Sequence, residues 1–297
     1  MPVHFIYHVP KCAGQTIDGH FSSVLPDSAY YKTAKRHGPG RFVFTRHDFR
    51  KLPDLSATKV VAGHFLGISL DAQFAGRLIK RSLLLRDPVG HALSYYNFRM
   101  MRYLSRGYHP YSFDVAYGAM HRNFITDYIL RHFLEMSWAR VAALGDEDKY
   151  DIVNAFLSKF WYVADYRLCD DLIGAIGTQL GIDGRAVPKN TQAQWERHVR
   201  WKSLELGDLS PGTIARIENE NLIDQRLWET WRNARNDVAH VRPRALAGLR
   251  ATGFITDEAV RFVNQIARRV QRRWGQVGGP EIPAPASAAE GSSAIPV

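Results

Sequence analysis

The feature that most constrains the fold is a regular alternation of short apolar runs with helical patterns in the first third of the chain. Four runs rich in β-branched, aromatic and leucine residues predict strands, at residues 3–9, 41–46, 58–63 and 81–86. Helical patterns follow such runs, at residues 15–25, 71–80 and 88–105. Short apolar strands separated by helices are typical of a parallel sheet that helices cover on both faces. The alternation therefore predicts an α/β fold.

Beyond this core the pattern is mostly helical. The middle part, residues 112–160, reads as helices with aromatic core positions. One late strand is predicted at 160–166, followed by a helix at 168–180 and a loop at 183–195. These segments predict helical additions to the sheet rather than a second sheet.

The C-terminal part divides into helices and a tail. Apolar residues at helical spacing predict helices at 213–234 and 256–275, and the second has a basic face. Residues 278–297 are rich in Pro, Ala and Ser and hold too few large apolar residues to bury a core. We therefore expect one domain over residues 1–277 and a disordered tail after it.

Composition narrows the class of protein. The chain has 297 residues, 45% hydrophobic content and a formal net charge of +10. No apolar run reaches the roughly 18 residues of a membrane-spanning helix, and two cysteines, Cys12 and Cys169, form no disulfide framework. The N-terminus reads as the first strand, not as a signal peptide. We expect a cytoplasmic protein whose charge suits nucleotides, nucleic acid, acidic glycans or a membrane surface.

The first predicted strand runs into a loop, HVPKCAGQT at residues 8–16, that has the means to hold an anion. Ala13 and Gly14 are small, so that successive backbone N–H groups can converge on a ligand. The helix that follows presents its positive N-terminus, and Lys11 adds a full charge. The sequence predicts a P-loop-like anion site. The alternative is an ordinary turn with an exposed lysine.

Two further predicted strands also end in polar residues. The third ends in a Gly-His pair at His64, and the fourth in Arg86, Asp87 and Pro88, with Ser94 two turns into the next helix. Asp87 is expected as the N-cap of that helix, with Pro88 at its first position. The planar guanidinium of Arg86 suits a phosphate, although a solvated arginine beside a capped helix is the alternative. In a parallel sheet all three strand ends meet at one edge, where ligands bind.

Together these segments resemble the sulfotransferases that use 3′-phosphoadenosine 5′-phosphosulfate (PAPS). The first loop is similar to the family's Pro-Lys-x-Ala-Gly-Thr-Ser/Thr motif, and the Arg-Asp-Pro segment with its later serine is similar to its second motif. Further segments resemble, in order, the branch that includes the 2-O uronosyl and related glycan sulfotransferases. They are VAGHF (61–65), HRNFITDYIL (121–130), YVADYRLCDDLIGAIGTQLGI (162–182), VPKNTQ (187–192) and ENENLIDQRLW (218–228). The resemblance extends over about residues 3 to 233.

The resemblance implies a set of donor-binding residues. They are Lys11, Cys12, Ala13, Gly14, Gln15, Thr16, Arg86, Ser94, Lys189 and Asn190. The first loop would grip the 5′-phosphosulfate, Arg86 and Ser94 the 3′-phosphate, and Lys189 and Asn190 would close over the nucleotide. The alternative for the last two is a basic loop without a ligand. Two positions depart from the family pattern: Gln15 replaces Thr or Ser, and His91 replaces a frequent Arg.

Sulfuryl transfer makes two chemical demands on the site. A cation is needed beside the leaving oxygen, and a base is needed for the acceptor hydroxyl. We expect Lys11 to supply the cation and His64 to act as the base. His47 and Asp48, after the second predicted strand, are the reserve base candidates. No metal is expected, because no spacing of His, Cys and carboxylate residues predicts a metal site.

The sequence thus predicts a PAPS-dependent sulfotransferase that transfers a sulfuryl group by in-line displacement to a hydroxyl of a carbohydrate, glycolipid or related acceptor. A P-loop nucleotide kinase or NTPase is one alternative, but Gly-x-x-x-x-Gly-Lys-Ser/Thr is missing from the sequence. A basic nucleic-acid-binding protein is the other, although no recognised module is present and no specific nucleic acid is expected. The basic face of 256–275 leaves open a peripheral contact with the inner face of a membrane.

Overall fold

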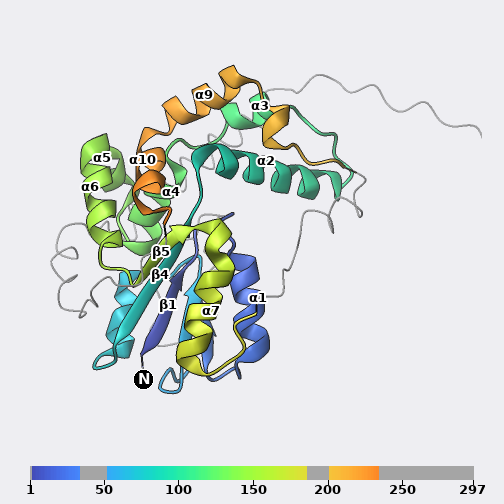
Figure 1. The fold of residues 1–297 in the computed structure, drawn as a ribbon. Coiled ribbons are helices and arrows are strands. Elements are labelled where there is room, and N and C mark those ends of the chain that lie inside the picture. Colours follow the sequence, from blue (N-terminus) through green and yellow to red (C-terminus); the bar gives the residue numbers. More distant parts are fainter. Residues whose placement is uncertain (1, 34–51, 186–200, 234–297) are drawn as a thin grey trace, which may run out of the picture. The chain divides into compact units, whose positions relative to one another are not determined.

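The computed structural model describes the chain except for residues 1, 34–51, 186–200 and 234–297 (Figure 1). Within the described residues, one sheet holds the strands in the order β2-β3-β1-β4-β5. The strands are β1 (Val3–Tyr7), β2 (Tyr30–Lys32), β3 (Val60–Gly63), β4 (Ile79–Leu85) and β5 (Tyr162–Asp165). All neighbouring strands are parallel. The predicted α/β fold with a parallel sheet flanked by helices is confirmed.

Helices make up most of the remaining described chain. They are α1 (Gly14–Val24), α2 (Pro88–Leu104), α3 (Phe113–Gly118), α4 (Phe124–Tyr128), α5 (Trp138–Ala143), α6 (Asp146–Leu157), α7 (Cys169–Leu180), α9 (Pro211–Glu220) and α10 (Leu222–Trp231). A π-helical turn, Ile129–Phe133, continues α4. Short 3-10 helices lie at Ile68–Phe74, Tyr166–Leu168 and Leu206–Asp208.

The sheet is buried on both faces, which explains its continuous apolar strands. In β1, Phe5 and Tyr7 pack into a cluster with α4, α6 and α10, whereas Ile6 packs into a second cluster with α1 and α7. Figure 1 shows α1 and α7 together over one face of the sheet. A third cluster joins α2, α3 and α9 around Tyr96 and Met100. The helical additions therefore have a core of their own.

The sheet order brings three loops together. β1 lies between β3 and β4, with Ile6 opposite both Ala62 and Ser82. The loops that leave β1, β3 and β4 therefore emerge side by side at the carboxyl edge of the sheet. In open α/β sheets this edge is where ligands bind, at the point where the connections diverge.

Two predicted helices are wrong. Residues 71–80 form the end of a 3-10 helix and then, from Ile79, the start of β4. Asp71 accepts a hydrogen bond at 2.6 Å from the buried Arg81 of β4, and this pair fixes the segment against the sheet. The predicted helix 213–234 is two helices, α9 and α10, with a break at Asn221.

One strand of the sheet was not predicted. β2 lies at Tyr30–Lys32, where it pairs with β3, a segment too short and too polar for its sequence to predict. The predicted strand 41–46, the predicted helix 256–275, the tail 278–297 and the domain boundary at 277 lie outside the described residues.

Candidate functional site

The loop between β1 and α1 has an unusual backbone. Lys11 and Ala13 both adopt left-handed conformations, with φ of 70° and 58°. Ala13 is the N-cap of α1, so the first-turn N–H groups of Gly14 and Gln15 point out of the helix end. Within the described part of the chain these two N–H groups have no hydrogen-bond acceptor. Outward N–H groups at a helix N-terminus form the kind of cradle that binds a phosphate or sulfate.

Glycine at position 14 is required by a neighbouring histidine that the sequence did not single out. A Cβ on Gly14 would lie 1.7 Å from Nε2 of His8, so no other side chain fits there. The His8 ring also stacks on that of His64, with centroids 3.9 Å apart and planes at 24°. Burial, together with His64, Lys32 and Lys11, keeps the pKa of His8 well below its usual value. The His8 ring is therefore neutral and lies between Gly14 of the loop and the ring of His64.

His64 is held in one tautomer. Its Nδ1 lies 3.0 Å from the carbonyl oxygen of His8, and since a carbonyl only accepts, Nδ1 carries the proton and donates. In the neutral ring the lone pair then belongs to Nε2. Tyr128 donates a hydrogen bond at 2.6 Å to the carbonyl oxygen of His64. A histidine with a fixed backbone and a fixed tautomer is suited to accept a proton at one defined atom.

The ammonium group of Lys11 is largely enclosed by neighbouring side chains. Its Nζ lies 4.3 Å from the ring centroid of Phe98, on α2. Burial, and next the charge of Arg86, lower the pKa of Lys11 to about 8. Burial and the charge of Arg86 therefore destabilise the charged form of Lys11. An anion bound beside the ammonium would stabilise the charged form again.

Arg86 lies at the end of β4, against the same loop. Its Nη1 donates to the carbonyl oxygen of Lys11 at 3.2 Å, and its guanidinium lies 4.1 Å from the ring centroid of Tyr166. Its Nε is buried and has no acceptor among the described residues. Gly90 lies beside this Nε. A side chain at position 90 would crowd the Nε, since its Cβ would lie only 3.2 Å away. A buried N–H donor without an acceptor is costly, so this site suits an anion.

The structure brings Lys11, Arg86 and Ser94 into one pocket. This pocket, called here the basic pocket, has a volume of about 450 Å³ and is also lined by Arg167 and Glu205. Arg167 is partly neutralised, since it lies 3.7 Å from Asp165 and 3.9 Å from Asp87. Lys11 and Arg86 therefore supply most of the positive charge that a ligand would meet.

His64 and Gln15 line a different pocket on the other side of the first loop. It measures about 500 Å³ and also holds Gly14, Asp18 and Lys32. Lys32 is paired with Asp18. His64 therefore shares its pocket with Gly14 and Gln15 of the predicted donor-binding set, whereas Lys11, Arg86 and Ser94 line the basic pocket.

Two other predicted loop residues line neither of these pockets. Cys12 is buried in the core, its N–H donates to Val9 at 3.2 Å, and burial raises the pKa of its thiol to about 12. Such a thiol is not a nucleophile. Thr16 donates its N–H to the carbonyl of Ala13 at 3.0 Å, within the first turn of α1. Both residues stabilise the loop through the backbone.

His91 has a different role from the basic contact that the family pattern led us to consider. It is buried, and burial lowers its pKa to about 4, so the ring is neutral near pH 7. Its Nε2 donates to the carbonyl oxygen of Pro10 at 3.1 Å. His91 therefore ties α2 to the first loop. Asp87 is the predicted N-cap of α2, and its Oδ1 accepts from the N–H of Gly90 at 2.6 Å.

The segments around Asn123 and Asp224 cap each other. Asp224 accepts from the N–H groups of Ile125 and Thr126 at 2.9 and 2.8 Å, while Asn123 accepts from the N–H groups of α10. Asn221 in turn accepts from the N–H of Asn123 at 2.8 Å. These reciprocal caps join α4 to α10, two helices that lie about 100 residues apart in the chain.

Several predicted features lie outside the described residues or stay expectations. Lys189, Asn190, His47 and Asp48 are not described. Among the residues that are, no three metal-binding side chains gather into a cluster, and no helix has the length and apolarity to cross a membrane. Comparison with protein-family models, curated proteins and solved structures gave no match. The function is therefore argued from the site alone.

Proposed function

We propose that this protein is a PAPS-dependent sulfotransferase. The observation that most supports the proposal is the basic pocket, which Lys11, Arg86 and Ser94 line together. A donor with two separate phosphate groups needs two anion sites. We assign one to the N–H groups of Gly14 and Gln15 with the neighbouring Lys11, and the other to Arg86 with Ser94.

In the proposed reaction the donor lies on the first loop, with its sulfuryl group between the basic pocket and His64. An acceptor hydroxyl attacks the sulfur atom, and the bond from sulfur to the bridging phosphate oxygen breaks. The proton of the hydroxyl passes to Nε2 of His64. Lys11 and the N–H groups of Gly14 and Gln15 stabilise the charge that develops on the leaving bisphosphate. No step requires a metal ion.

The acceptor is proposed to be a hydroxyl of a carbohydrate, a glycolipid or a related compound, reached from the side of His64. The protein would act in the cytoplasm, where a peripheral contact with the inner face of a membrane would bring a glycolipid within reach. The basic charge of +10 favours such a contact.

A P-loop kinase or NTPase is the second candidate function, since the sheet and the first loop suit a triphosphate as well. The position of Lys11 before Gly14, and the second anion site at Arg86, favour the bisphosphate donor instead. Magnesium-dependent ATP turnover by the purified protein would favour the kinase or NTPase.

The test is a transfer assay with labelled PAPS against a panel of glycans, glycolipids and small alcohols. Lys11→Ala should abolish turnover and weaken donor binding, whereas Lys59→Ala, at the other edge of the sheet, should change neither. His64→Ala should lower kcat by about a hundredfold or more and leave donor affinity intact. The matched control is His109→Ala on the surface. Equal losses of kcat and donor affinity in His64→Ala would make His64 a binding residue.

A further inference from the structure

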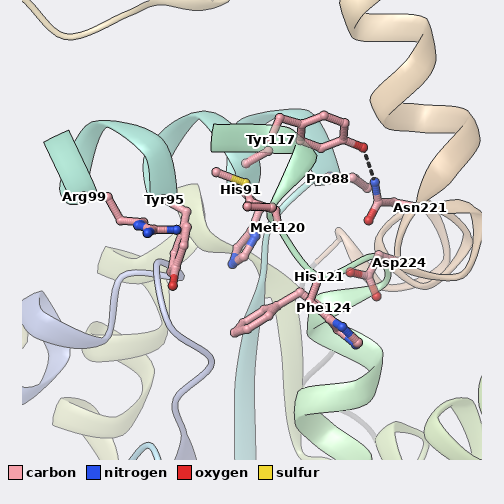
Figure 2. A pocket seen from close by; sticks show the side chains of 12 residues that line it. Pro88, His91, Tyr95, Arg99, Tyr117, Met120, His121, Phe124, Asn221 and Asp224 are labelled. Atoms are coloured by element: carbon pink, nitrogen blue, oxygen red, sulfur yellow. Dashed lines mark hydrogen bonds between the residues drawn. The ribbon is translucent and has the colours of Figure 1, made fainter. Parts of the chain in front are cut away.

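A third pocket, which the proposed chemistry does not use, lies between α2, the segment that leads from α3 into α4, and α10 (Figure 2). We call it the aromatic pocket, after the rings of His91, Tyr95 and Phe124 and the side chain of Met120 that line it. Its volume is about 200 Å³. Since a cavity of about 150 Å³ binds benzene, this pocket has room for one substituted ring.

The rings form one aromatic surface. His91 and Phe124 have centroids 5.1 Å apart with planes at 25°, and His91 and Tyr95 have centroids 6.4 Å apart with planes at 18°. Figure 2 shows His91 and Tyr95 from α2 and Phe124 from α4 reaching into a common space. Faces of this kind favour a flat apolar group that can stack on them.

Three polar side chains in the wall of the pocket, those of Asp224, Asn221 and His121, are already engaged. Asp224 accepts three hydrogen bonds from Ile125 and Thr126, and Asn221 donates to Tyr117 and Ile217. His121 is paired with Asp127 at 2.6 Å. A sugar ring would bring several hydroxyls and find few partners for them, which is costly in a confined site. An aryl ring brings no such demand.

The charges around the pocket favour an uncharged ligand. Arg99 lies at one side and Asp224 at the other, and both line the pocket. Arg99 lies 5.8 Å from the ring centroid of Tyr95, so its charge is directed onto the aromatic surface. Asp224 would repel an anion and Arg99 would repel a cation. A neutral ring would be repelled by neither and could stack on the aromatic faces.

The aromatic pocket is connected through its wall residues to both predicted catalytic residues. His91, in its wall, donates to the carbonyl oxygen of Pro10, the residue before Lys11. Phe124, in the same wall, lies 5.5 Å from the ring of Tyr128, which donates to the backbone of His64. One residue thus separates the pocket from each of the two predicted catalytic side chains.

We propose that the aromatic pocket binds an uncharged aryl ring and, resting on the proposed sulfotransferase function, that this ring is the apolar part of the acceptor. The acceptor is then an aryl glycoside or a similar ring-bearing alcohol, not an unsubstituted sugar. The pocket would hold the ring while the hydroxyl extends over the first loop toward His64.

The first experiment measures the binding of p-cresol to the full chain by calorimetry. Ala119 is exposed and lines the pocket, so Ala119→Trp fills it without disturbing the core, and the exposed Val115→Trp on α3 is the matched control. We expect p-cresol to bind, with at least about tenfold weaker binding in Ala119→Trp and no change in Val115→Trp. If p-cresol does not bind, or binds equally to both variants, the proposal that the aromatic pocket binds an aryl ring is wrong. Binding of methyl β-D-glucopyranoside at the same site overturns the aryl assignment.

The second experiment separates the pocket from the proposed function. Binding of 3′,5′-adenosine bisphosphate is measured on the same samples, and transfer of labelled sulfate is compared for phenyl and methyl β-D-glucopyranoside. Preferred transfer to the phenyl glycoside, lost in Ala119→Trp, supports the acceptor role, and equal transfer overturns it. If the bisphosphate fails to bind while p-cresol binds, the sulfotransferase proposal and the acceptor role fail together and the aryl pocket stands.

Discussion

At the scale of single residues, the first loop depends on side chains that its own motif does not include. His8 fills the space beside Gly14, His91 holds the carbonyl of Pro10, and Phe98 faces the ammonium of Lys11. The left-handed conformations of Lys11 and Ala13 cost free energy, and these neighbours hold the loop in place. The proposed anion cradle therefore depends on β1, the loop and α2 together.

Lys11 predicts a pH dependence of donor affinity. Its pKa of about 8 means that the ammonium is charged below this pH and loses its proton above it. The dissociation constant of 3′,5′-adenosine bisphosphate should stay level up to about pH 8 and then rise by up to about tenfold per pH unit. Lys11→Arg keeps its charge and should show a level profile. The same rise in Lys11→Arg would assign the effect to another group.

Gly14 and His8 predict a coupled pair. Gly14→Ala places a methyl group on the His8 ring, so bisphosphate affinity should fall by at least about tenfold. His8→Ala removes the ring, and the double variant Gly14→Ala/His8→Ala should regain most of the affinity. Calorimetry on the four proteins measures the coupling. If the losses of bisphosphate affinity in the two single variants add up in the double variant, the contact between Gly14 and His8 does not determine the conformation of the loop.

At the scale of elements, the sequence predicts those helices whose ends have local signals. α2 was expected at 88–105 and spans Pro88–Leu104, because Asp87 and Pro88 mark its start. α7 was expected at 168–180 and spans Cys169–Leu180, because Gly181, with φ of 68°, ends it. The segment 71–80 was mispredicted because its end, from Ile79, pairs with Val3 and His4 of β1, which are far away in the sequence. Long-range contacts of this kind leave no local pattern in a single sequence.

The reciprocal caps of α4 and α10 predict a large effect of one buried carboxylate. Asp224→Ala leaves the N–H groups of Ile125 and Thr126 buried without an acceptor, and should lower the free energy of unfolding by about 2 to 4 kcal/mol. Asp224→Asn keeps one acceptor oxygen and should lower the free energy of unfolding by less. Asp114, exposed and paired with Arg216, is the control, and Asp114→Ala should change stability little. Equal losses for Asp224→Ala and Asp114→Ala, measured by urea unfolding, would contradict the capping role.

At the scale of the whole molecule, the sheet order determines which predicted residues meet. Lys11, Arg86 and Ser94 were expected at one edge and share one pocket, because β1 and β4 are neighbours. The separation of His64 and Gln15 into a second pocket was not predicted, since it depends on where the His8 ring lies. The aromatic pocket was missed for a similar reason. Tyr95 of α2 is only half-buried and faces Phe124 of α4, and a contact between residues so far apart leaves no pattern in the sequence.

Four histidines whose pKa values are lowered predict that the fold loses stability in mild acid. Burial lowers the pKa of His4 and His91 to about 4 and that of His132 to about 3, and His8 is lowered as well. The unfolded chain binds protons at these residues below about pH 6.5 and the folded chain does not, so the free energy of unfolding falls as pH falls. Asp224, whose pKa is raised to about 6, has the opposite effect.

Each of these four histidines should lower the free energy of unfolding by about 1 kcal/mol between about pH 7.5 and 5.5, and Asp224 should offset about one of them. Urea unfolding at the two pH values measures the sum. His91→Gln keeps a donor for Pro10 without titrating, and should reduce the pH dependence. A flat profile in the unsubstituted protein would contradict the buried, neutral state of these rings.

The most direct test of the account is a calorimetric comparison of 3′,5′-adenosine bisphosphate with ATP. The two proposed anion sites, one on the first loop and one at Arg86 and Ser94, predict that the bisphosphate binds at least about tenfold more tightly than ATP with or without magnesium. Arg86→Ala should remove this preference, because it removes the second site. Equal affinity for the two nucleotides, or tighter binding of ATP, would contradict the proposed sulfotransferase function.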